Sequence, residues 1–414
     1  MADALTTGKQ KMAEGVGFLL SLGILSGAAL LLGLLFARLR TSVIAAEILA
    51  GMLVGPYVLG WVTDVTVIAD IASVGIVVLL FLIGLELDPV KFVRMVGRAG
   101  GLTLIEMGLT FLAGLACARI LGLDLPETLV FAMAGSATST AIVGQLLLSR
   151  GMRDQTSRLL VGVLVIEDIA AVAFLNVVSS IPAGSAAGVG AGLEVLETAL
   201  GGVALLAIGF LVARYVAPPM INFLSHFEGE FEELPFLFAL GLGFGFGALG
   251  AYLGYSAGVG AFIIGLAMRG KHSKFLSGKV APIKGLLVFV FFVYMGTLID
   301  PFLSPRLLPA FLVSMVLLVA AKFVGGALVG RIIGARDALR ETNPSMVGAW
   351  LVPRGEFSFI IGQGALAAGL IDGSTFSLLG LTVLVTATVG PLLQRLGERG
   401  APRSEHPFKP DRDA

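Results

Sequence analysis

Long apolar stretches recur along the whole chain, and they decide what it can fold into. About thirteen such segments lie at roughly 16–37, 42–60, 67–87, 100–121, 127–149, 157–178, 194–217, 234–253, 255–269, 280–299, 307–334, 344–369 and 373–395. Most have about 20 residues, enough for a helix to cross the hydrocarbon core of a bilayer. They are continuously apolar and lack the alternation of barrel strands. We therefore expect an all-α polytopic membrane protein with about 13 transmembrane helices.

The composition excludes several function classes. The chain has 414 residues, of which 57% are hydrophobic and 14% are charged, whereas roughly a quarter of the residues of a soluble domain are charged. The formal net charge is zero, so no nucleic-acid partner is indicated. The single cysteine, Cys117, excludes an internal disulfide. The three histidines form no ligand cluster, so we expect no cofactor, and the lipid bilayer is the partner indicated.

The charges between the segments predict the orientation. Basic residues follow segments 1, 3, 5, 9 and 11, namely Arg38, Arg40, Lys91, Arg94, Arg98, Arg150, Arg153, Arg158, Lys271, Lys274, Lys279, Arg331, Arg336 and Arg340. The loop after segment 7 is mixed, and the other loops are mostly acidic or neutral. By the positive-inside rule the N-terminus is outside and the C-terminus is cytoplasmic. We expect a multi-pass protein of the cell (inner) membrane, with a transmembrane domain at 1–395 and a short cytoplasmic tail at 396–414.

Two segments end in related motifs. FLIGLELDP ends segment 3 and VYMGTLIDP ends segment 10, with Asp88 and Asp300 212 positions apart (300 − 88). The two segments cross in opposite directions, so the repeat is inverted, as in many secondary transporters. The alternative is that Asp-Pro is simply a common helix end. We expect repeat one at about 16–178, a connector helix at 194–217, and repeat two at about 234–395.

Each predicted repeat contains an interrupted segment. Segment 5 carries the polar patch GSATST (Gly135–Thr140), and segment 12, at the matching place, carries LVPRGEFSF (Leu351–Phe359) with helix-breaking Pro and Gly. A tolerated polar patch, with Ser and Thr bonding to their own helix, is the alternative for segment 5. Crossed discontinuous helices expose backbone groups that need compensating charges. We assign Arg354 and Glu356 chiefly that structural role, with ion contact as the minor one.

Two neighbouring acids lie in the apolar segment 6. Glu167 and Asp168 point about 100° apart on a helix, so they have different surroundings and different tasks. Lys322, near the middle of segment 11, is a suitable counter-ion for Glu167; the alternative is that Lys322 extends to an interface. Two further acids, Glu47 and Glu106, are interpreted as packing acids held protonated.

The pattern predicts chemistry at Asp168. Burial among apolar neighbours favours the neutral form of a carboxylate, which then holds a proton or a partly dehydrated cation but hardly both. Hard cations prefer oxygen ligands, which the main chain and hydroxyls of Ala137, Thr138 and Ser139 would supply. The hypothesis is that Asp168 binds the transported alkali cation or proton. The rival is a purely structural acid pair.

The chain resembles the second monovalent cation:proton antiporter family, which includes Kef-type potassium efflux systems and related sodium/proton exchangers. FLIGLELDP (Phe81–Pro89), SATST (Ser136–Thr140), IEDIA (Ile166–Ala170) and PRGEFSF (Pro353–Phe359) carry the resemblance. It implies a sodium/proton-antiporter-like fold with two crossed discontinuous helices in a core domain beside a dimerisation domain. It also implies a homodimer that works by elevator-type alternating access.

The resemblance also implies residue roles. It places the essential ion-binding carboxylate on Asp168 and puts Thr138 and Ser139 on the unwound crossing. Lys322 is similar to the core lysine that pairs with the acid before that aspartate. The chain departs from the family in carrying Glu-Asp, where relatives show Asp-Asp, Asn-Asp or Gln-Asp. A second ionisable group paired with a lysine indicates a transported charge imbalance, and leaves stoichiometry and ion open.

A second departure is the Arg-Gly-Glu-Phe sequence, where Kef proteins show Gly-Gly-Glu-Phe. Kef-type systems also often carry a cytoplasmic nucleotide-binding regulatory domain, which the 414 residues do not include. Either regulation is absent, or a separate cytoplasmic regulatory subunit supplies it, or a regulatory domain was removed.

The expected function is therefore antiport of K+ or Na+ against H+, without enzymatic activity. A Kef-like cation efflux channel and a sodium-coupled solute symporter of related fold are the alternatives. An intramembrane aspartyl protease is disfavoured because the chain has no GxGD sequence.

Overall fold

The computed structural model describes residues 2–39, 41–86, 100–143, 155–179, 201, 204–205, 207–225, 233–253, 257–268, 273–302, 304, 306–336 and 343–399. Every regular element within these ranges is helical. In chain order the helices of the first half are α1 (Ala2–Arg38), α2 (Val43–Val54), α3 (Thr66–Glu86), α5 (Gly101–Ile120), α6 (Leu125–Ser136) and α8 (Gln155–Ser179). The polytopic all-α fold class is confirmed.

The second half continues in the same way. A π-helical turn, η2 (Val212–Val216), leads into α10 (Ala217–Ser225), followed by α11 (Leu234–Tyr252), α12 (Ala257–Ala267), α13 (Ser273–Thr297), α14 (Leu308–Arg336), α15 (Pro344–Leu351), α16 (Glu356–Ala367) and α17 (Gly373–Arg399). The helix expected at 194–217 therefore extends to Ser225, and the last helix extends to Arg399, into the region expected as a tail. The Leu87–Pro89 part of the first repeat motif lies outside the described residues.

Length and apolarity fit a membrane. Within the described ranges, seven helical stretches are long and apolar enough to cross it: Gly17–Arg38, Thr66–Leu85, Gly101–Leu121, Ala207–Leu224, Leu234–Tyr252, Leu308–Ile332 and Gly373–Arg395. Val43–Val54, Ala257–Ala267 and Ile283–Thr297 are shorter apolar helices. Large apolar side chains are exposed on these helices, as Leu31 of α1 and Val316 of α14 show, and such a surface is compatible with lipid.

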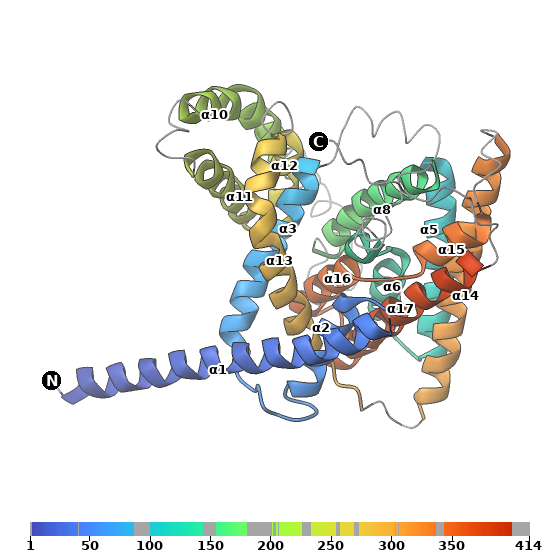
Figure 1. The fold of residues 1–414 in the computed structure, drawn as a ribbon, viewed down its shortest axis with the longest axis horizontal. Coiled ribbons are helices and arrows are strands. Elements are labelled where there is room, and N and C mark those ends of the chain that lie inside the picture. The colour runs from blue at the N-terminus through green and yellow to red at the C-terminus, as the bar shows by residue number, and fades with distance from the viewer. Residues whose placement is uncertain are drawn as a thin grey trace, which may run out of the picture.

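The helices pack in two groups. In one, α3 packs on α12 and α13, α2 packs on α1 and α13, and α11 packs on α12. In the other, α5 packs on α6 and α14, α15 packs on α14 and α17, and α16 packs on α6 and α8. Figure 1 shows α3, α11, α12 and α13 on one side of the molecule and α5, α6, α8 and α14 on the other. Thinner contacts, of α2 with α17 and α8 with α12, join the groups.

Segments 5 and 12, expected as interrupted, are both discontinuous. Segment 5 is helical up to Ser136, non-helical at 137–139, and helical again from Thr140. Segment 12 is divided into α15 and α16 by the non-helical stretch 352–355. Both breaks belong to the second group of helices, where the candidate site lies.

Candidate functional site

The first break follows from the residues at the end of α6. Asp124 caps the start of this helix, where its side chain accepts a hydrogen bond from the Glu127 amide. At the other end Ala137 is extended, with φ −82° and ψ 139°. Ser and Thr favour such irregular backbone because their hydroxyls can bond to it. The chain re-enters a helix at Thr140, which leaves backbone groups on both sides without partners inside a helix.

The two breaks satisfy each other's backbone. The Ser139 amide donates to the Pro353 carbonyl at 2.8 Å, and Thr138 Oγ1 donates to the Leu351 carbonyl at 3.0 Å. Ser358 Oγ of α16 donates to the Ala134 carbonyl of α6 at 2.6 Å. These bonds join stretches more than 200 residues apart, so the discontinuous helices cross at their unwound parts.

Charged side chains complete the helix ends at the crossing. Arg354 Nε donates to the Gly135 carbonyl at 3.0 Å and Nη1 to the Val352 carbonyl at 2.9 Å. A cation there matches the negative end of a helix dipole. Glu356 accepts at 2.7 Å from the Ala141 amide and at 2.7 Å from Ser139 Oγ, so its negative charge lies at the N-terminus of the half-helix that begins at Thr140. Arg354 and Glu356 are both buried.

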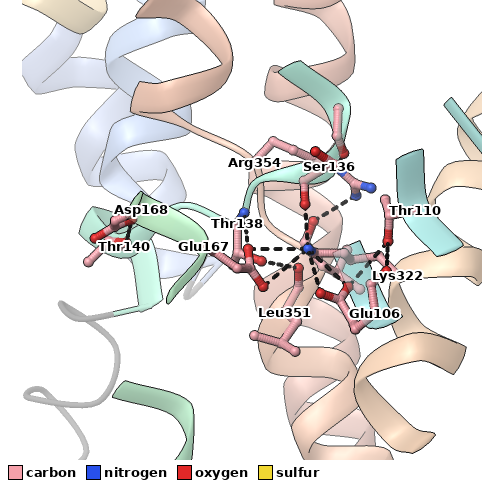
Figure 2. Close-up of polar contacts among 12 residues, drawn as sticks. Glu106, Thr110, Ser136, Thr138, Thr140, Glu167, Asp168, Lys322, Leu351 and Arg354 are labelled. Carbon is pink, nitrogen blue, oxygen red and sulfur yellow. Dashed lines mark hydrogen bonds and ion pairs between the residues drawn. The ribbon is translucent and has the colours of Figure 1, made fainter. Parts of the chain in front are cut away.

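Lys322 of α14 lies in a buried polar cluster beside the crossing (Figure 2). Its ammonium is 2.9 Å from Glu106 Oε1 of α5 and 3.2 Å from Glu167 Oε2 of α8, and it donates to the Ser136 carbonyl at 2.5 Å. Glu167 Oε2 also accepts from the Thr138 amide at 2.6 Å. The structure therefore brings Glu167 and Lys322 together with the unwound backbone.

Asp168 has different surroundings from its neighbour. It is 2% exposed, and its Oδ1 accepts a hydrogen bond from Thr140 Oγ1 at 2.6 Å. Figure 2 shows Asp168 and Thr140 to one side of Glu167, and Lys322 to the other. Glu356, Glu167 and Lys284 act on Asp168 electrostatically. Within the described structure no ion pair reaches its carboxylate, which leaves it available for a cation or a proton.

Two residues of this site were not predicted from the sequence. Glu106, interpreted as a packing acid held protonated, lies with its Oε1 2.9 Å from Lys322 Nζ and so belongs to the buried cluster. Its place two residues before Gly108 in an apolar run resembled many packing positions, so no sequence signal separated it from Glu47. Thr140 is the last residue of the GSATST patch and was not predicted as a site residue, although its hydroxyl donates a hydrogen bond to Asp168. The hydroxyls of Thr138 and Ser139, expected as cation ligands, bond instead to Leu351 and Glu356.

The chain matches a known protein family over most of its length. Residues 26–395 match the family model described as sodium/hydrogen exchanger, transmembrane. The chain belongs to this family. It is therefore a multi-pass membrane protein of a transporter family, not an enzyme.

Two bacterial proteins of known function are similar to the chain. It is 31% identical over 380 residues to the glutathione-regulated potassium-efflux system protein KefC of Klebsiella pneumoniae, a match that covers 89% of the chain and 58% of that relative. The chain thus spans little more than half the length of KefC. It is 29% identical over 381 residues to the K(+)/H(+) antiporter subunit KhtU of Bacillus subtilis, covering 87% of the chain and 89% of KhtU.

A solved structure has the same fold as the chain. The sodium proton antiporter MjNhaP1 of Methanocaldococcus jannaschii superposes with a TM-score of 0.65, over 92% of the chain and 99% of MjNhaP1, at 15% identity. At that identity the likeness shows the fold alone. The antiporter-like fold expected from the motifs is confirmed.

Proposed function

We propose that the protein is a secondary active antiporter that exchanges a monovalent cation, K+ or Na+, for H+. The observation that carries this proposal is the surroundings of Asp168. Its carboxylate is buried, accepts a hydrogen bond from one hydroxyl, and lies beside an unwound crossing whose other charged side chains already bond to backbone groups or to one another. One buried site that takes either a proton or a cation is the minimum requirement for exchange, because each ion must leave before the other binds.

The cation would be held by oxygen. Asp168 supplies a carboxylate, and Thr140 supplies a hydroxyl at the same place. The main-chain carbonyls of Ala137 and Thr138, in the non-helical stretch 137–139, would be the further hard ligands, whereas the Ser139 carbonyl already accepts a hydrogen bond from the Val143 amide. KefC and KhtU are named for potassium efflux and K+/H+ antiport, which favours K+ as the first cation to test.

We propose an inverted repeat, supported by matched close approaches between helices. A side chain at Gly84 of α3 would collide with the backbone of α12, and one at Gly296 of α13 would collide with the backbone of α2. The two glycines are 212 positions apart (296 − 84), the offset of the repeat motif. In the reverse direction Gly265 of α12 meets α3 and Gly51 of α2 meets α13. The contact between α3 and α12 therefore corresponds to the contact between α13 and α2, with α2 equivalent to α12 and α3 equivalent to α13.

We propose that transport follows an elevator-type alternating access. The site lies wholly in the group that contains α5, α6, α8 and α14–α17, and this group has thin contacts with the group that contains α3, α12 and α13. In an elevator mechanism the group of helices that holds the ion moves relative to the other group, and thin contacts between the two groups allow this movement. Homodimer formation, a cytoplasmic C-terminus and a separate regulatory subunit remain parts of the proposal; KhtU is itself described as a subunit.

The test uses purified protein in liposomes with an acidic lumen and a pH dye inside. K+, Na+ or Li+ is added outside in separate runs. Alkalinisation of the lumen is expected for at least one cation in the wild type, and its loss is expected in Asp168→Asn. Glu47→Gln is the matched control, because it changes another membrane carboxylate, on α2 and outside the site.

Other outcomes would contradict the proposal. If wild type and Asp168→Asn gave equal signals, Asp168 would not be the carrier. If cations crossed without moving protons, the protein would be a channel. If no cation moved protons in any run, a symporter of related fold would be the better reading.

A further inference from the structure

We propose that a cavity between the two groups of helices is a second, weaker site for the transported cation, about two helical turns from Asp168, and that Gln363 is the residue that binds the cation there. This inference rests on the proposed antiport function and adds a specificity-determining residue to it. Gln363 lies in α16, beyond the PRGEFSF motif, and has no role in the site described above.

The Gln363 cavity has a volume of about 210 Å³. One wall is formed by α3 and α12, and the other by α8 and α16. Small residues, Ala257 and Gly258 of α12 and Gly364 and Ala367 of α16, leave the space between the walls. A water molecule takes up about 30 Å³ in the liquid, so the cavity has room for a cation together with several water molecules.

Helix geometry places this cavity in line with the ion site. Leu175, in the cavity wall, comes seven residues after Asp168 on α8, and Gln363 comes seven residues after Glu356 on α16. Seven residues are nearly two turns, so each pair lies on one face of its helix, about 10 Å apart along the axis. Glu356 itself bonds to the crossing. The cavity therefore lies about two turns beyond Asp168, which is the outer side in the orientation proposed above.

Gln363 offers the cavity an oxygen ligand. Its Oε1 is buried and has no hydrogen-bond partner among the described residues, which is unfavourable for an amide carbonyl. Amide oxygen is a hard ligand suited to alkali cations, so a cation, or water bound to a cation, would satisfy it. The other polar residue of the lining is Ser73, whose hydroxyl donates to the Ala69 carbonyl at 2.9 Å and can still accept a hydrogen bond.

A neutral amide distinguishes the two ions that compete at Asp168. The carboxylate of Asp168 can take either a proton or a cation, whereas the amide of Gln363 accepts a cation and stays unprotonated. None of the described residues that line the cavity is charged. Removing the amide should therefore weaken cation binding and leave the proton half of the exchange unchanged.

The two walls of the cavity belong to different groups of helices. Gln363 of α16 is in the same group as Asp168 of α8, and Ser73 of α3 is in the other group. In the elevator motion proposed above, Gln363 moves together with Asp168 and keeps its distance from it. A cation held by Gln363 can thus pass to Asp168 along the surface of α8 and α16.

The test measures the cation dependence of proton movement in liposomes, with the cation found active above. Gln363→Met removes the amide and keeps the length of the side chain. Its apparent KM for the cation should rise about threefold or more, the range expected for one lost polar contact. The maximal rate, and the pH dependence at saturating cation, should stay near those of the wild type. An unchanged apparent KM would overturn the inference.

Gln363→Glu tests whether the side-chain oxygen is what matters. This variant keeps an oxygen ligand and adds a carboxylate, so at alkaline pH its apparent KM should be equal to or lower than that of the wild type. Because a carboxylate can also bind a proton, the apparent KM should rise as the pH falls. A raised apparent KM at alkaline pH, equal to that of Gln363→Met, would overturn the role of the oxygen.

Gln394 of α17 provides the matched control. It is 0% exposed, its amide has no hydrogen-bond partner among the described residues, and it does not line the cavity. Gln394→Met makes the same chemical change at another buried position and should keep the wild-type apparent KM. An equal rise in both Met variants would show a general effect of losing a buried amide and would overturn the assignment to Gln363.

A second measurement does not depend on the folding of the Gln363 variants. The chain has one cysteine, Cys117, which is buried, so Ser73→Cys would place an accessible thiol in the cavity. Aminoethyl methanethiosulfonate, a small cationic thiol reagent, should slow exchange by Ser73→Cys but not by the wild type, and the transported cation should slow the modification. Modification that leaves exchange unchanged, or that the cation does not slow, would overturn the inference.

The wild-type protein keeps this inference and the proposed function apart. Absence of cation-dependent proton movement in the wild type would overturn the antiport function and the inference with it. Exchange by the wild type with the same apparent KM in Gln363→Met would overturn the inference alone.

Discussion

Glu167 and Asp168 are neighbours in the chain, but their carboxylates do different things. Glu167 faces Lys322 and the Thr138 amide, while Asp168 faces Thr140. The division follows from helix geometry, because successive side chains point about 100° apart. One acid can therefore be tied into a fixed cluster while the next stays available for transport.

Thr140 allows a prediction at this scale. Replacing Thr140 with Val removes the hydroxyl that donates to the Asp168 carboxylate, the group that we propose binds the cation. A hydrogen bond to a charged group is worth about 1.5–3 kcal/mol, so the apparent KM for the cation should rise about tenfold or more. The measurement is the cation dependence of proton movement in liposomes at one fixed pH.

The matched control is Thr140→Ser, which keeps the hydroxyl and removes one methyl group. It should retain an apparent KM near that of the wild type. If Thr140→Val behaved like Thr140→Ser, the hydroxyl would have no part in binding.

At the scale of the element, helix ends explain why charged residues lie inside this fold. The crossing leaves buried backbone groups without partners in a helix, and Arg354, Glu356 and Lys322 bond to them. The start of α17, outside the crossing, is stabilised by an N-cap residue. Asp372 precedes α17 and accepts hydrogen bonds from the Thr375 amide and from Ser374 Oγ, both at 2.8 Å. These hydrogen bonds lower the pKa of Asp372 below its usual value of 3.8, and the one from the Thr375 amide has the larger effect.

This cap predicts a pH-dependent contribution to stability. A carboxylate with a lowered pKa in the folded state stabilises the protein above its unfolded pKa, and that stability is lost as the pH falls through the folded pKa. Asp372→Ala should therefore lower the unfolding temperature at pH 7. The loss of the N-cap should reduce the free energy of unfolding by about 0.5–2 kcal/mol. The difference from wild type should shrink below about pH 4. Thermal unfolding in detergent at both pH values checks it.

Asp372→Asn is the control for the charge. Asn is also a good N-cap, so this variant should keep most of the stability at pH 7 and show less change with pH. Equal pH dependence in Asp372→Asn and the wild type would mean that Asp372 does not contribute the titrating group.

At the scale of the whole molecule, glycine contacts hold one group of helices together. Gly84 and Gly296 allow α3 to approach α12 and α13 to approach α2, backbone to backbone. In lipid, where apolar surface gains little from burial, such close packing drives much of helix association. The rigidity of this group would provide the fixed partner that elevator motion requires.

The glycine contacts predict matched effects on stability. Gly84→Ala and Gly296→Ala should each destabilise the protein, because a methyl group would collide with a backbone that cannot easily move; overpacking of this kind costs about 1–3 kcal/mol. The control is Gly108→Ala on α5, where nothing lies within 4 Å of the added carbon. Thermal unfolding of the three variants in one detergent is the measurement. Loss of stability in only one of the two contact variants would contradict the proposed repeat.

Several features were decided by the sequence alone. Long apolar runs without strand-like alternation leave helices as the structure that satisfies every backbone group in lipid, so the fold class followed directly. Pro353 and Gly355 predicted one break, and the SATST patch predicted the other. The placement of Glu167 near Lys322 could be anticipated, because an isolated charge in an apolar run requires a partner.

Other features were decided only by the tertiary structure. The sequence could not show that Glu106 joins Lys322, because an acid in an apolar helix looks the same whether it packs protonated or pairs with a base 216 positions away. Nor could it tell which hydroxyl of Ser136–Thr140 reaches Asp168, since that depends on how the unwound backbone turns. The hydrophobic pattern of the sequence indicates which segments are buried. Which buried charged side chains contact one another depends on how two helices that are distant in the sequence cross. That meeting determines which charged groups surround Asp168.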